Sequence, residues 1–109
     1  MRFPRFVQTI TIRSDNPDRI VALAQAWDDL QSSTDVMGYV GTQVLADRDE
    51  PGRYLIVANF AQVDPDVTAW EEAMKNNDRP ETQQWAEQLR ELAVEEPGFA
   101  NYDELYRTG

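Results

Sequence analysis

The sequence predicts an α+β fold, and three patterns along the chain lead to this conclusion. Segments in which apolar residues alternate with other residues, such as residues 5–13, are typical of half-buried strands. Segments with apolar residues three and four positions apart predict helices, each expected to begin close to a proline. The predicted order is β-α-β-β-α-(α)-β, which is the ferredoxin-like split βαβ arrangement with a four-stranded antiparallel sheet.

The first half of the chain predicts a strand, a helix and a second strand. In the strand at residues 5–13, the amide Gln8 shares a face with apolar side chains. Capping residues and Pro17 start a helix that should end near Ser32 or the next serine. Residues 36–46 predict the second strand, and the two glycines within it indicate a bend or bulge.

The second half predicts a turn, a central strand, two helices and a closing strand. Gly52 follows a proline, as in a type II turn, and residues 53–61 are apolar on both faces, as in a covered strand. Asp64-Pro65-Asp66 predicts the start of the second helix, and Pro80 opens the third. An aromatic segment at residues 99–107 predicts the last strand.

The composition limits the classes of protein that the chain can belong to. Its 109 residues predict one domain over residues 1–109, and no apolar run is long enough to cross a bilayer. There is no cysteine and no histidine, so we expect no metal site, no cofactor and no Ser-His-Asp mechanism. The net charge of −10 argues against nucleic-acid and anionic membrane partners. No signal peptide is evident, and we expect a cytoplasmic protein.

The apolar content of the second and third strands predicts a homodimer. Helices can cover one face of a four-stranded sheet, but both faces of these strands carry apolar side chains. An uncovered apolar sheet face is rare in a monomer. We therefore expect two copies to pack sheet against sheet about a twofold axis and form a shared barrel. The apolar residues in question are Val40, Val44, Leu55, Ile56, Val57 and Phe60.

Five segments resemble those of a known family. They are the opening strand "FVQTITI", the strands "GYVGTQVL" and "YLIVANF", the helical "AWEEAM", and the aromatic strand that follows "EEPGF". In the order of its strands and helices and in its apolar pattern, the chain resembles the dimeric α+β barrel superfamily, and within it the antibiotic biosynthesis monooxygenase-like domains. The resemblance implies small dimers with a pocket between the sheet and the helices of each subunit. Some members oxidise polycyclic phenols without metal or flavin.

Another branch of that superfamily degrades haem, and the chain departs from its pattern. That branch has an asparagine on the first strand, where this chain has Gln8, and a tryptophan on the second helix, matched by Trp70. Its iron-ligating histidine has no counterpart, because the chain contains no histidine. We therefore do not expect haem degradation by that mechanism.

Six polar or aromatic residues are the candidate site residues. The catalytic candidates are Gln8, Trp70 and Asn59. The side-chain amides of Gln8 and Asn59 would hold oxygen atoms of the substrate, and the indole of Trp70 would form a wall of the pocket. The candidates for substrate contact are Tyr39, Trp27 and Tyr102. Each could instead be a packed core residue or a buried polar group bonded to the backbone.

Two functions remain open at this point. The first is a cofactor-independent monooxygenase that acts on a small aromatic or polyketide-like substrate. The second is a non-catalytic dimer that binds a small molecule or serves as a stress-related accessory protein, because one fold can host many functions. A partner-binding module with an acidic face is a third idea, supported only by the net charge.

Overall fold

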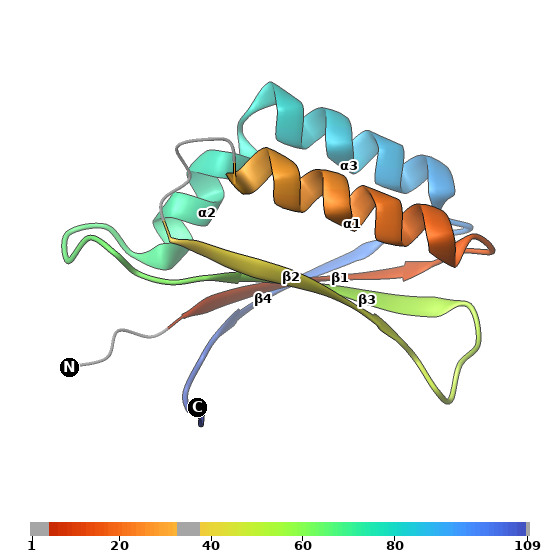
Figure 1. Ribbon diagram of the computed structural model, residues 1–109, viewed down its shortest axis with the longest axis horizontal. Coiled ribbons are helices and arrows are strands. Elements are labelled where there is room, and N and C mark those ends of the chain that lie inside the picture. Colours follow the sequence, from red (N-terminus) through yellow and green to blue (C-terminus); the bar gives the residue numbers. More distant parts are fainter. Residues whose placement is uncertain (1–4, 33–37, 109) are drawn as a thin grey trace.

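A computed structural model describes residues 5–32 and 38–108 of the chain as two layers, a sheet and the helices that cover one of its faces (Figure 1). The antiparallel sheet has the order β2-β3-β1-β4, formed by β1 (Phe6–Arg13), β2 (Tyr39–Ala46), β3 (Arg53–Phe60) and β4 (Gly98–Asp103). The helices are α1 (Pro17–Ser32), α2 (Ala69–Asn77) and α3 (Pro80–Leu92). This is the predicted ferredoxin-like order.

Side chains alternate between the two faces of the sheet, as the sequence predicted for β1. Phe6, Ile10 and Ile12 are buried beneath the helices, and Gln8 lies among them on the same face. In the neighbouring strand β3 every second side chain, from Ile56 to Phe60, is buried in the same core. The intervening residues of both strands form the other face of the sheet, which none of the helices in the described ranges covers (Figure 1).

Helix α3 packs mainly on α1. Trp27 of α1 and Trp85 of α3 are both buried where the two helices meet, with ring centroids 4.9 Å apart. Leu89, one turn further along α3, is also buried in the core. Because α3 rests on another helix, the space between α3 and strands β1 and β4 is incompletely filled.

The turn between β2 and β3 has the predicted glycine geometry. Gly52 has a φ of +89°, which L-residues rarely adopt and which position three of a type II turn requires. Asp47 accepts hydrogen bonds from the backbone amides of Asp49 and Glu50, and these bonds lower the pKa of its carboxyl group. Strand β2 also has the expected irregularity, a register shift between Tyr39 and Gly41. The predicted strand residues 36 and 37 lie outside the described part of the chain.

Two predicted boundaries are wrong. The second helix begins at Ala69 rather than at Pro65, with Thr68 as the N-cap that accepts from the amide of Glu71. The Asp64 carboxylate instead accepts a 2.9 Å hydrogen bond from the amide of Asp66 and closes a turn.

Strand β4 is the other element whose end was predicted wrongly. It ends at Asp103 rather than at residue 107. Asp103 pairs with Phe6, the first residue of β1, and the amide of Glu104 donates a 2.9 Å hydrogen bond to the carbonyl of Arg5 just beyond this pair. No helix in the described ranges is both long enough and apolar enough to span a membrane.

Candidate functional site

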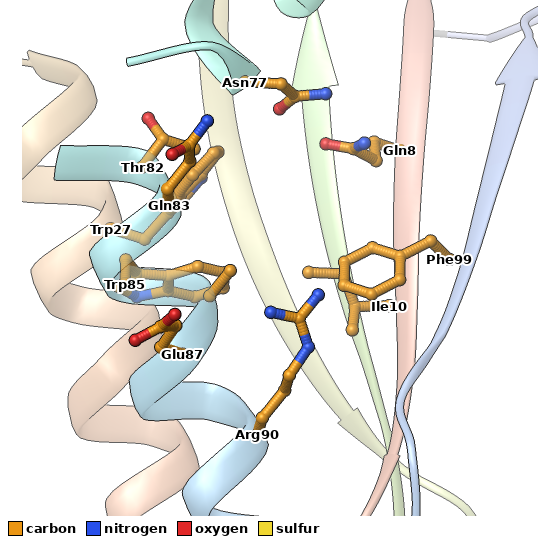
Figure 2. A pocket seen from close by; sticks show the side chains of 11 residues that line it. Gln8, Ile10, Trp27, Asn77, Thr82, Gln83, Trp85, Glu87, Arg90 and Phe99 are labelled. Carbon is orange, nitrogen blue, oxygen red and sulfur yellow. The ribbon is translucent and has the colours of Figure 1, made fainter. Parts of the chain in front are cut away.

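A cavity of about 350 Å³ lies between α3 and the strands β1 and β4 (Figure 2). The cavity is open to solvent on one side and mixes apolar with polar walls. The strands contribute Gln8, Ile10 and Phe99, α1 contributes Trp27, and α2 contributes Asn77. Helix α3 supplies the remaining wall with Thr82, Gln83, Trp85, Ala86, Glu87 and Arg90.

The register of the sheet brings the strand residues of the cavity together. Ile10 is directly opposite Phe99 in the antiparallel pair of β1 and β4, so the two side chains are neighbours on the helix face. Gln8 is opposite Asn101 in the same pair. Since β4 is an edge strand and α3 does not pack closely on it, this part of the covered face stays accessible.

Two tryptophans form the inner wall of the cavity. The rings of Trp27 and Trp85 are tilted by 46° and nearly excluded from solvent. The indole N–H of Trp85 donates a 2.8 Å hydrogen bond to the carbonyl of Leu23, which fixes its orientation. The Trp27 Nε1 is buried without a hydrogen-bond partner in the described residues. Buried donors are usually satisfied, so an acceptor supplied by a bound molecule or water would stabilise this arrangement.

Two side-chain amides face each other at one end of the cavity. Figure 2 shows Gln8 pointing from β1 toward the helices, with Asn77 opposite it. Gln8 is only partly buried, and its Nε2 is 3.5 Å from the Oδ1 of Asn101, the upper limit for a hydrogen bond. The amide of Gln8 is therefore available to a ligand rather than locked into the core.

The opposite end of the cavity carries a positive charge. Arg90 extends from α3 toward Ile10 and Phe99 (Figure 2). Its Nε is 3.2 Å from the Glu96 carboxylate, which follows α3 in the chain. Its two terminal nitrogens make no hydrogen bond or ion pair with any of the described residues. Glu87 is the second charged residue of the wall and lies beside Trp85.

The predicted catalytic residues do not share one cavity. Gln8 lies opposite Ala58 in the β1–β3 ladder, so Asn59, one residue further, points to the uncovered face. Trp70 is 49% exposed at the start of α2 and borders a separate surface hollow with Gln62. The prediction that these three residues line one pocket is wrong.

The periodicity of α2 explains the position of Trp70. The buried residues of this helix are Ala69, Ala73 and Asn76, at spacings of four and three. Trp70 follows Ala69 directly, so it is rotated by about 100° away from that buried stripe. Within α2, the predicted stripe is confirmed at Ala73, which is buried, and at Met74, which packs against the core, but it is wrong at Trp70.

The predicted substrate-contact residues are also separated. Trp27 lines the cavity, whereas Tyr102 is 54% exposed and lies beside Val7 on the uncovered face. The Tyr39 hydroxyl lies 2.8 Å from Asp28 and 2.6 Å from Thr42, outside the cavity. Burial raises the pKa of Tyr39 to about 12. The hydrogen bond with Thr42 lowers this pKa, whereas the hydrogen bond to Asp28 and the negative charge of Asp28 raise it further.

Several wall residues were not among the sequence candidates. Phe99 was predicted as a strand residue, and Asn77 as part of a helix interruption, but neither position carries a chemical signature. Arg90 follows the buried Leu89 on α3 and looks like an ordinary exposed helix residue in the sequence. Only the arrangement of α3 above β4 brings these residues to one cavity. No cluster of three or more potential metal ligands occurs among the residues described.

Comparison with known proteins gives matches at the level of structure alone. No protein family matches the sequence, and a search of curated proteins finds no match. A solved structure from Nitrosomonas europaea, named as a candidate antibiotic biosynthesis monooxygenase, superposes with a TM-score of 0.71 at 14% identity, covering 100% of this chain and 98% of the other. A similarly named Deinococcus radiodurans structure gives 0.69 at 15% identity, covering 95% and 96%.

A third solved structure, a protein from Shewanella oneidensis, has a TM-score of 0.66 at 20% identity, covering 93% of this chain and 91% of the other. The chain has the antibiotic biosynthesis monooxygenase-like fold. At these identities the similarity establishes the fold over nearly the whole length of each chain. It agrees with the fold that the five sequence segments implied.

Proposed function

We propose that the chain is a cofactor-independent monooxygenase that acts on a small aromatic substrate in the cavity between α3 and strands β1 and β4. The observation that carries this proposal is the pairing of a tryptophan wall with an accessible amide, held by one long hydrogen bond, in a single cavity. Trp27 and Trp85 offer flat apolar surfaces to a ring, and Gln8 can donate to an oxygen on that ring. The fold shared with structures named as candidate monooxygenases supports the same function.

The proposed reaction takes its electrons from the substrate. Loss of one proton from a CH₂ group gives the ionised phenol form of the substrate, which transfers one electron to dioxygen. The radical at the same carbon, now a CH group, combines with superoxide and takes up a proton to form a hydroperoxide. Loss of water then converts that carbon to a carbonyl. One oxygen atom ends in the new C=O group and the other in water with both hydrogens of the CH₂ group, so the overall reaction is CH₂ + O₂ → C=O + H₂O.

The cavity residues have distinct parts in this proposal. The tryptophan pair holds the ring and excludes water from one of its faces. The Nε2 of Gln8 donates to the phenolate oxygen, on which negative charge is concentrated before electron transfer. Asn77 lies opposite and binds a second substrate oxygen. No role at this cavity is assigned to Trp70 or Asn59.

Oxygen uptake with a panel of anthrone-type phenols tests the proposal. We expect uptake by the unmodified protein, and a decrease of roughly 100- to 1,000-fold for Gln8→Ala, the range found for loss of one donor to a developing charge. The matched control is Asn59→Ala, which removes an amide from the other face of the sheet and should leave uptake unchanged. Equal losses in both variants, or no uptake with any phenol, would contradict the proposal.

Binding without turnover is the second candidate function. One feature favours it: among the described residues of the cavity wall, Glu87 alone is of a type that commonly acts as a general base, and no histidine, lysine, tyrosine or cysteine borders the cavity. In that case aromatic phenols would bind with quenching of tryptophan fluorescence, and no oxygen would be consumed. Measuring both signals on the same sample distinguishes the two candidates.

We further propose that two copies associate through the uncovered face of the sheet. Between the strand ends this face carries no charged side chain in its described part. An uncharged surface of this kind favours a self-complementary twofold contact. Its side chains belong to Val7, Thr9, Thr11, Gln43, Leu45, Leu55, Val57, Asn59, Ala100 and Tyr102.

A further inference from the structure

We infer that the cavity is selective for planar aromatic carboxylates, with the carboxylate paired to the terminal nitrogens of Arg90. This inference rests on the proposed function, because it names the substrate class of the same cavity. The ring would lie in the apolar middle of the cavity, and a hydroxyl or carbonyl oxygen would meet the amides at the far end.

The arrangement of the wall sets the order of groups along the ligand. Figure 2 shows Gln8 and Asn77 at one end of the cavity and Arg90 at the other. Trp85 and Phe99 lie between them. The cavity therefore offers neutral hydrogen-bonding groups, then apolar surface, then a cation, which complements an aromatic acid with a hydroxyl or carbonyl group opposite its carboxylate.

The hydrogen bonding of Arg90 leaves part of its guanidinium group unused. Glu96 contacts only the Nε, at 3.2 Å. Two parallel N–H groups on one edge of a guanidinium match the two oxygens of a carboxylate, and such bidentate pairs are stronger than neutral hydrogen bonds. By holding the Nε, Glu96 acts as a positioning residue that keeps the remaining nitrogens directed into the cavity.

The negative net charge of the chain makes a cation at the cavity, Arg90, significant for the binding of an anion. The sequence has 20 acidic residues against 10 basic ones, so its mean electrostatic field repels anions. An anionic ligand would therefore be held only where a local cation offsets that field. Glu87 also borders the cavity, so the carboxylate must lie at the Arg90 guanidinium rather than beside Trp85.

An ordinary exposed ion pair is the competing interpretation of Arg90. Its side chain is 47% exposed, and exposed ion pairs contribute little to stability. That interpretation predicts no discrimination between charged and neutral ligands of the same shape. The two interpretations therefore differ in a ligand-binding measurement.

The experiment compares 6-hydroxynaphthalene-2-carboxylate with its neutral isostere, 6-hydroxynaphthalene-2-carboxamide. Isothermal titration calorimetry on the full chain at pH 7 under argon measures binding while oxygen chemistry is prevented. We expect the carboxylate to bind about tenfold more tightly than the carboxamide, the scale of a partly exposed charge-assisted hydrogen bond. Arg90→Gln should remove this difference and leave carboxamide binding unchanged.

Arg48→Gln is the matched control. It makes the same change in net charge in the turn between β2 and β3, away from the cavity, and should retain the tenfold preference. Equal binding of the two compounds by the unmodified protein would overturn the inference. Loss of the preference in Arg48→Gln as well would also overturn it, because the effect would then come from net charge.

The outcomes also separate this inference from the proposed function. Preference for the carboxylate that depends on Arg90, without oxygen uptake by any phenol, would support the carboxylate site and contradict the monooxygenase. Oxygen uptake with neutral phenols, with neither naphthalene compound binding, would support the monooxygenase and overturn the carboxylate site.

Discussion

The two faces of the sheet are built from the same strands but have different surroundings. On the covered face, Ile56 is almost fully buried beneath the helices of its own chain. On the uncovered face, the adjacent Val57 is only partly buried, although it is also a β-branched apolar residue at the centre of the sheet. The helices therefore bury one face of the sheet, and the other face retains apolar surface that is available to a second copy.

The covered face itself is not uniform. Over the central strands it carries the closely packed core, whereas under α3, toward the edge strand β4, it leaves the cavity with Gln8 on its wall. An amide on the closely packed side would be buried at a cost unless it found a partner. At the cavity the amide stays accessible, so the structure tolerates it on an otherwise apolar face.

The largest expected effect comes from placing a charge on each face in turn. Ile56→Asp would bury an unpaired carboxylate, at a cost of several kcal/mol, a large part of the roughly 5–15 kcal/mol that stabilises a small domain. Val57→Asp would place the carboxylate on the uncovered face, where a monomer can hydrate it. We expect Ile56→Asp to fail to fold and Val57→Asp to remain folded but monomeric. Circular dichroism and sedimentation velocity measure these two results.

The matched control for that experiment is Val57→Thr, which keeps the β-branched shape without adding a charge. We expect it to remain dimeric at micromolar concentration. If the unmodified protein sediments as a monomer, or if Val57→Asp stays dimeric, the sheet-to-sheet assembly is wrong.

A smaller effect should distinguish the two tryptophans of the cavity wall. Trp85→Phe removes a hydrogen bond to the Leu23 carbonyl, whereas Trp27→Phe removes a buried N–H that has no partner in the described structure. The two changes delete similar ring volumes, so their difference isolates the hydrogen bond. We expect Trp85→Phe to lower the free energy of unfolding by about 1 kcal/mol more than Trp27→Phe, as measured by urea denaturation.

That comparison has a clear contrary result. If Trp27→Phe is as destabilising as Trp85→Phe, the Trp27 N–H must have a partner in solution, such as a bound water. A ligand acceptor at that position would then have to displace this partner.

An effect of similar size concerns pH and Tyr39, the first residue of β2, at the edge of the covered face. Its folded-state pKa of about 12 lies above the unfolded value of about 10, so burial stabilises the neutral phenol. This contribution is fully present below pH 10 and is lost as the pH rises toward 12. Because the side chain is partly exposed, we expect only about 1 kcal/mol, obtained as the difference between the unmodified protein and Tyr39→Phe. A difference that stays constant from pH 9 to 12 would contradict it.

The sequence predicted the fold well because each element carries its own local signal. Pro17 and Pro80 mark helix starts, and Gly52 marks a turn, through restrictions on their own backbone angles. The prediction failed at Asp64, because a carboxylate accepts a hydrogen bond from a nearby backbone amide both when it caps a helix and when it closes a turn. It failed at Asn59 because strand alternation gives two faces but does not say which one faces the helices.

The sequence by itself determined the order of strands and helices, the alternation of faces, and the absence of histidine and cysteine chemistry. Only the tertiary structure decided that Gln8, Trp27 and Arg90 border one cavity while Asn59 and Trp70 do not. The physical reason is that periodicity describes one element at a time. A cavity depends on how one element is aligned and rotated against another, and here the packing of α3 on α1 and the ladder register of β1 set that alignment.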